Sequence, residues 1–290
     1  MSSTRRSVNT KAQLSFYKTV TAAVSDIIEH GYDNQSRVED WTRRIREAAE
    51  RDLTPHKELE AALVKNLKAT FNRMVNRNQQ ILQFHPNVPE FAISNVMPKL
   101  RSELDRRVMS SANIIKLNRE RAIEETVQRY QGWATSIPPG GTKVAERLKI
   151  KKNISASLKK LPFKERRVIV DQSHKMVANL NEIIAIEGNA IAAKWHSNWR
   201  EPNYDYRLDH KERDEKIYAI RGSYALKNGW MNKGAGYTDD MTKPGEEPNC
   251  QCFETHLYIL QDLPARMLTK KGKDEIARVA KLRKPRRRTM

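Results

Sequence analysis

Apolar side chains recur every three or four residues along the first 135 positions, which is the spacing of amphipathic helices. The first stripe comprises Leu14, Tyr17, Val20, Val24, Ile27 and Ile28. Gly31 is expected to end this helix, and Ser36 with Glu39 forms a capping box that starts the next one. Repeated stripes of this kind predict that the helices pack against one another in a bundle.

Prolines mark the later helix boundaries. Thr54-Pro55 predicts the start of a third helix, and the two prolines in segment 85–89 predict a break after it. Pro98 suits the first turn of a long fourth helix that continues to about residue 130. Segment 137–142 (IPPGGT) is the clearest linker-like break in the chain.

The pattern changes in the last third of the chain. Pro162 is expected to open a helix that runs towards Ala193, and helical periodicity fades after Trp195. Segment 216–220 (KIYAI) is a strand candidate. A second candidate alternates with a period of two, which predicts a half-buried strand. Its apolar set is Phe253, Thr255, Leu257 and Ile259, and its polar set is Glu254, His256 and Tyr258.

These patterns predict an α+β protein in four parts. An extended amphipathic helical region covers residues 1–135, and a linker with a short helix covers 136–160. A small α+β module with a short antiparallel sheet covers 161–265, and a basic tail covers 266–290. We expect helices from the N-terminal side of the module to cover its sheet.

Composition excludes several classes of protein. Val, Ile, Leu and Phe make up 61 of the 290 residues, so the core is thin and a large β-sandwich or doubly wound sheet is not expected. The two cysteines, Cys250 and Cys252, cannot form a disulfide framework. No stretch has the 18 or so apolar residues of a membrane-spanning helix, and no membrane partner is expected.

Positive charge is concentrated at the C-terminus. The formal net charge is +19, and residues 269–290 carry ten Lys or Arg against two acids. This predicts non-specific contact with the phosphates of double-stranded DNA, although a solvated tail that keeps the protein soluble is the simpler alternative. The residues expected to bind DNA are Lys281, Arg283, Lys284, Arg286, Arg287 and Arg288.

Cys250 and Cys252 are also candidate metal ligands. In an extended chain their side chains point to the same side, and with His210 they supply donors for a tetrahedral zinc site of structural role. The fourth ligand is expected among Asp214, His196 and His256. The alternative is that both cysteines are small buried residues at the start of a strand. A nucleobase deaminase is disfavoured because its cysteines are separated by two residues, not one.

The region from Lys194 to Cys252 carries a set of residues in a distinctive order. We call this set the head-protein signature, after the family that it resembles. Its members are Lys194, Trp195, Arg207, His210, Asp214, Pro248, Asn249, Cys250 and Cys252. In this order and spacing the region resembles the phage head morphogenesis family, the Mu F-like minor head proteins. The resemblance covers about residues 165–260.

This resemblance implies a structural protein of a tailed bacteriophage rather than an enzyme. Its expected partners are the portal protein, the major capsid or scaffold protein and packaged DNA. Its expected roles are head assembly and DNA packaging or ejection, inside the head near the portal after synthesis in the host cytoplasm. The amphipathic helices before residue 135 would supply docking surfaces. The alternative is a zinc-dependent hydrolase or nuclease that uses His210, Cys250 and Cys252.

Overall fold

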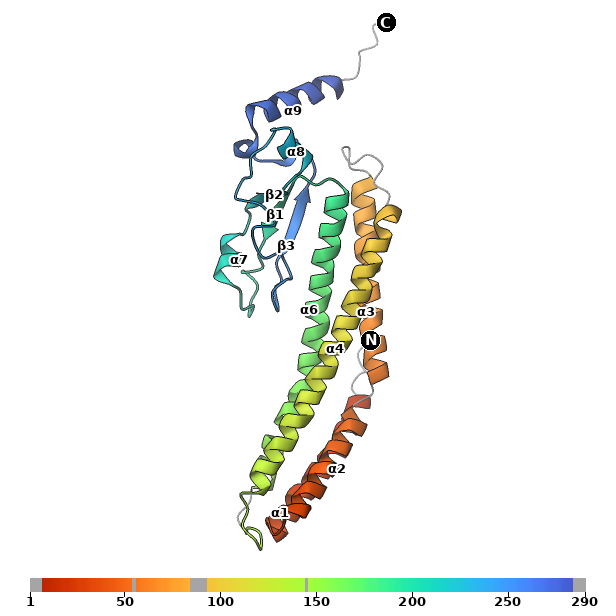
Figure 1. Cartoon of the computed structure of the whole chain (residues 1–290), viewed down its shortest axis with the longest axis vertical. Helices are drawn as coiled ribbons and strands as arrows, with labels where there is room; N and C mark the ends of the chain where they lie inside the picture. Colours follow the sequence, from red (N-terminus) through yellow and green to blue (C-terminus); the bar gives the residue numbers. More distant parts are fainter. Residues whose placement is uncertain (1–6, 54–55, 84–92, 144–145, 284–290) are drawn as a thin grey trace. The chain divides into compact units, whose positions relative to one another are not determined.

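The computed structural model describes residues 7–53, 56–83, 93–143 and 146–283. It shows an α+β protein with long N-terminal helices and one small antiparallel sheet, as the sequence predicts (Figure 1). The long helices are α1 (Ser7–His30), α2 (Gln35–Leu53), α3 (His56–Gln83), α4 (Ile93–Ala134) and α6 (Ala156–Glu187). None of the helices in the described ranges is long and apolar enough to cross a membrane.

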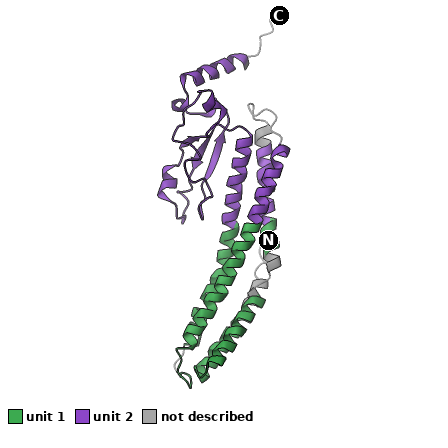
Figure 2. Ribbon diagram, viewed as in Figure 1, with its two compact units in different colours: residues 1–65, 109–169 green, residues 66–108, 170–290 purple. Residues whose placement is uncertain are grey.

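The chain divides into two compact units (Figure 2). Unit 1 comprises residues 1–65 and 109–169, and unit 2 comprises residues 66–108 and 170–290. The helices α3, α4 and α6 each contribute residues to both units.

Unit 1 is a helical bundle with a buried apolar core. Its core is formed by α1, α2, the second part of α4, α5 (Arg147–Ile154) and the start of α6. Side chains from each of them meet in one core, among them Val20, Ile27, Ile45, Val127, Ile154 and Leu158. The stripe residues of α1 and α2 are therefore used for mutual packing, as their spacing predicts.

The segment that looks like a linker is docked onto the end of α1. Gly140 donates a backbone hydrogen bond to His30 O at 2.9 Å, and Thr142 donates one to Ile28 O at 2.9 Å. Gly141 has a φ of 80°, and a Cβ atom there would lie 2.1 Å from Ile28 O. Only glycine fits this approach, so segment 137–142 is part of unit 1 rather than a free spacer.

Three predicted helix starts are displaced. The cap of α2 is Asn34, whose Oδ1 accepts the Arg37 N–H at 2.9 Å, so the helix begins before Ser36. Pro98 and Pro162 lie inside α4 and α6 instead of opening them. Burial explains these extensions, because the preceding turns carry buried side chains such as Val96 and Leu158. Thr54-Pro55 and segment 85–89 lie outside the described residues.

Unit 2 holds the sheet, in the order β2-β1-β3 with antiparallel pairing throughout. Its strands are β1 (Ala192–His196), β2 (Ile217–Ala219) and β3 (Phe253–Leu257). Shorter elements are α7 (Leu208–Glu212), α8 (Tyr224–Lys227), η1 (Leu260–Asp262) and η2 (Ala265–Met267). Both expected strands are present, although the second ends at Leu257.

The sequence pattern predicts that the helix after Pro162 continues towards Ala193, which lies in the central strand β1 of the structure. In the structure α6 ends at Glu187, and Asn189 takes a left-handed φ of 59° while its N–H bonds to Ile186 O. Gly188 and Asn189 thus form a helix stop that turns the following apolar run into the sheet. A continuous apolar run fits a buried strand as well as a helix, so periodicity alone misassigns it.

The burial of β3 is the reverse of what its alternation predicts. Glu254 and His256 pair with Trp195 and Ala193 and share their buried face, with side chains 11% and 10% exposed. Phe253 is 46% exposed and stacks on His196. The polar set faces inward because this side of β3 lines a polar cavity beside α6.

The basic C-terminal stretch begins as a helix. The helix α9 (Lys270–Arg283) packs where Gly272 meets the backbone of Trp230, since a Cβ at this glycine would lie 2.0 Å from Trp230 O. Thr269 N–H also donates to Trp230 O at 3.1 Å. Residues 270–283 therefore belong to the folded part of unit 2.

Candidate metal centre

A short helix and a turn bring His210 and the two cysteines together. His210 lies in α7, and this helix begins directly after the extended residue Arg207. The chain reaches Cys250 through a turn in which the Cys250 N–H bonds to Glu247 O at 3.2 Å. Pro248 and Asn249 occupy its centre, and Asn249 takes the positive φ of 61° that the third residue of a type II turn requires.

The three side chains form one buried group, the His/Cys cluster (His210, Cys250 and Cys252). His210 Nδ1 lies 3.6 Å from Cys250 Sγ and 3.5 Å from Cys252 Sγ. The residues are 1%, 2% and 5% exposed, respectively. The sequence-predicted metal ligands therefore converge from positions 40 residues apart.

The protein environment favours a thiolate at Cys250. The pKa of Cys250 is lowered to about 5 by a hydrogen bond from Cys252 and by the backbone N–H groups of Gly245 and Cys252. The pKa of Cys252 is raised by the same thiol–thiol hydrogen bond and by burial. The two sulfur atoms therefore share one proton and titrate as a pair.

The second nitrogen of His210 faces carboxylates. Nε2 lies 3.4 Å from Glu247 Oε2 and 3.8 Å from Asp209 Oδ2. Arg207 forms an ion pair with Glu247 and donates a hydrogen bond to Pro248 O at 3.1 Å. Glu247 thus connects Arg207 to the imidazole, a contact that sequence reasoning missed because the head-protein signature does not include this position.

Trp195 of the head-protein signature packs against the cluster, whereas Asp214 holds the chain that leaves β1. Trp195 is fully buried, and its ring meets the His210 ring edge-on with centroids 5.4 Å apart. Asp214 accepts the Ser197 N–H at 2.8 Å and the Trp199 Nε1–H at 2.9 Å, which fixes the chain that leaves β1. Lys194 lies on the opposite face of β1, where it pairs with Glu215.

None of the three expected fourth ligands joins the cluster. Asp214 is committed to Ser197 and Trp199, and His196 contacts Glu215 at 3.1 Å and Thr255 at 3.0 Å. His256 lies beside Glu254 at 3.9 Å. Among the described residues, the group of potential His, Cys, Asp and Glu ligands at this point contains three members.

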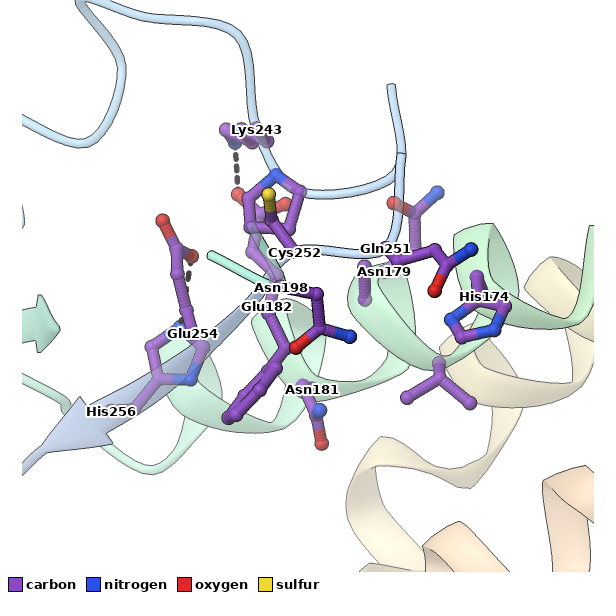
Figure 3. Close-up of a pocket in the computed structure, with 14 residues that line it drawn as sticks. His174, Asn179, Asn181, Glu182, Asn198, Lys243, Gln251, Cys252, Glu254 and His256 are labelled. Atoms are coloured by element: carbon purple, nitrogen blue, oxygen red, sulfur yellow. Dashed lines mark hydrogen bonds and ion pairs between the residues drawn. The ribbon is translucent and has the colours of Figure 1, made fainter. Parts of the chain in front are cut away.

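A polar cavity of about 140 Å³ adjoins the cluster (Figure 3). Cys252 forms part of its wall, and Lys243 pairs with Glu182 across it. Burial and the neighbouring Glu182 charge raise the pKa of Glu254 to about 7, whereas burial and Lys243 lower the pKa of His256 to about 4. His256 is therefore uncharged near neutral pH, whereas Glu254 is about half protonated there. The only sequence feature that singles out Glu254 and His256 is the alternation of β3. That alternation predicts that they face solvent, whereas in the structure they line the cavity.

The expected DNA-binding residues lie at the end of α9 and beyond it. Lys281 is exposed on α9, and Leu282 beside it is 72% exposed. Arg283 ends this helix. The residues Lys284, Arg286, Arg287 and Arg288 lie outside the described part of the chain.

Comparisons with known proteins do not assign the site. Scans against protein-family models, curated proteins and solved structures found no match to this chain.

Proposed function

We propose that this protein is a structural minor head protein of a tailed bacteriophage, associated with the portal or the head interior and in contact with packaged DNA. The observation that carries the proposal is the convergence of the head-protein signature. Its residues are spread over 59 positions in the sequence (194–252), yet most of them meet around one buried group. Convergence supports the resemblance because residues aligned by chance have no reason to contact one another.

The contacts within the signature are structural in kind. Arg207 holds the turn through Pro248 O, and Trp195 packs on His210. Asn249 donates its backbone N–H to Asp171 of α6 at 2.8 Å. These bonds hold together a loop-rich part of unit 2 in which the apolar group is small, which is the role expected of a buried polar network.

Burial favours this role over the hydrolase alternative. A metal-dependent hydrolase must place substrate at the metal. The three residues of the His/Cys cluster are at most 5% exposed, so the cluster lies beneath the surface of unit 2. Positive charge supports a location next to DNA, since the formal net charge of the chain is +19.

The test is co-expression of the full chain with the portal protein of the same phage, followed by purification through the portal. We expect this chain to co-purify and to be present in purified heads in far fewer copies than the major capsid protein. A chain that stays free of the portal and is absent from purified heads would contradict the proposal.

A further inference from the structure

We propose that His210 Nδ1, Cys250 Sγ and Cys252 Sγ bind one Zn²⁺ ion that fastens α7 to the turn before β3. This inference concerns unit 2 alone and does not depend on the proposed place of the protein in a virion. It rests on the geometry of the cluster, on its hydrogen bonds and on the chemistry of its donor atoms.

The distances match the edges of a zinc tetrahedron. Zinc lies about 2.3 Å from a thiolate and about 2.0 Å from an imidazole nitrogen, so tetrahedral geometry separates the two donors by about 3.5 Å. The two S···Nδ1 distances are 3.6 and 3.5 Å. All three donor atoms lie within 4.8 Å of one another, so one ion placed between them can contact all three.

Hydrogen bonding alone does not satisfy this arrangement. Both sulfur atoms approach the same imidazole nitrogen, and its single lone pair accepts one S–H proton at most. A cation at the common centre satisfies the nitrogen and both sulfur atoms at once. It also removes the need for the two buried sulfur atoms to share one proton.

Backbone N–H groups surround both sulfur atoms and would stabilise metal-bound thiolates. Cys250 Sγ accepts backbone N–H groups from Gly245 and Cys252, and Cys252 Sγ accepts one from Asn198. Two thiolates and a neutral imidazole also balance the charge of a divalent ion, which matters in a buried site. Sulfur and imidazole donors select zinc over the oxygen-seeking ions magnesium and calcium.

Glu247 acts as the positioning residue. A metal on Nδ1 requires the proton on Nε2, and Glu247 Oε2 lies 3.4 Å from that nitrogen. In the structure His210 Nε2 is buried without a hydrogen bond of good geometry. With the metal on Nδ1, Glu247 Oε2 would be the acceptor for this N–H, and Arg207 holds the carboxylate in place.

The ion would connect segments that the sheet does not. It joins α7 to a turn 40 residues later, close to the start of β3. The apolar group around it is small, with Trp195, Tyr218 and the two cysteines buried and Met241 partly buried. Zinc binding would therefore supply part of the folding free energy of unit 2.

The experiment is metal analysis of the full-length protein purified after expression with added zinc. We expect one zinc per chain, and Co²⁺ exchanged into the wild-type protein should give tetrahedral absorption with sulfur-to-cobalt charge transfer. The cobalt spectrum reports thiolate ligation without any substitution, so it holds even if a ligand variant fails to fold. Protein that purifies without zinc and shows no cobalt charge-transfer band overturns the proposal.

Variants then assign the ligands. His210→Asn and Cys252→Ser should lose the zinc, whereas His256→Gln, which changes another buried histidine of unit 2, should retain it. Glu247→Gln should keep the one-to-one stoichiometry with zinc affinity about 10- to 100-fold lower, because the outer carboxylate only orients the ligand. Glu246→Gln is its matched neighbour and should bind as the wild type does. Full zinc retention by His210→Asn contradicts the ligand assignment. Equal zinc affinity in Glu247→Gln and Glu246→Gln contradicts the role given to Glu247.

Discussion

At the residue scale, a buried histidine on β3 makes the stability of the fold depend on pH. His256 faces the polar cavity together with Glu254, Glu182 and Lys243. Burial lowers its pKa from 6.5 to about 4. Between these values the unfolded chain binds a proton that the folded protein excludes, so acid destabilises the fold through this group.

We therefore predict a pH-dependent difference between the wild type and His256→Gln. Relative to the variant, the wild type should lose up to about 1 kcal/mol of unfolding free energy per pH unit as pH falls from 6.5 towards 4. Denaturant unfolding of both proteins at several pH values measures this, and Glu254 titrates in both, so its contribution largely cancels. A difference that stays constant with pH would show that His256 is not held neutral.

Gly141 gives a second prediction at this scale. A Cβ at this residue would collide with Ile28 O, while Gly140 has a similar φ of 87° and open space around it. Gly140→Ala should lower the free energy of unfolding by about 1 kcal/mol, because alanine is strained in a left-handed backbone. Gly141→Ala should lower it clearly more, because segment 137–142 must also move away from α1. Equal thermal unfolding midpoints for the two variants would mean that the close approach is absent in solution.

At the element scale, local caps determine where the helices begin. The Asn34 side chain accepts the Arg37 N–H at 2.9 Å and the Ser36 hydroxyl at 2.7 Å. Because Asn34 satisfies a backbone donor at the start of α2, it is the cap that the sequence pattern assigned to Ser36.

Asn34→Ala is therefore expected to destabilise the protein by about 1 kcal/mol, within the usual range for caps. Ser36→Ala keeps the cap and should cost only a few tenths of that amount, which makes it the matched control. Chemical denaturation of the full chain distinguishes the two. If Ser36→Ala proves the more damaging substitution, the capping box predicted from the sequence is the correct one.

At the scale of the whole molecule, the excess of positive charge is the dominant property. The formal net charge is +19, and the last seven residues contain Lys284, Arg286, Arg287 and Arg288. Such charge attracts polyanions by releasing their bound counterions, so its signature is the salt dependence of binding rather than any sequence preference.

Changing these four residues to Gln should make the slope of log affinity for duplex DNA against log salt shallower by up to about 3 to 4 units. A shuffled version of residues 284–290 keeps the charge and should keep the slope. Titrations at several salt concentrations with DNA of unrelated sequence provide the measurement. An unchanged slope in the glutamine variant would place DNA contact elsewhere on the protein.

The sequence by itself determined the class of fold, the helical bundle and the three members of the His/Cys cluster. These features depend on local signals: apolar spacing in α1 and α2, the Gly31 stop, and cysteines placed to project on one side. The helix α1 ends at His30, directly before that glycine. Local periodicity records which face of an element is buried when that face is apolar.

Only the tertiary structure decided the central strand, the buried face of β3 and the partner of His210. The strand β1 follows an apolar run that suits helix or strand, and its neighbours β2 and β3 settle the choice by pairing with it. Glu254 and His256 turn inward because α6 and Lys243 complete a polar cavity there. Glu247 reaches His210 through a turn 37 residues away. Such contacts depend on which distant segments pack together in the folded chain, and the local pattern of apolar and polar residues does not specify that packing.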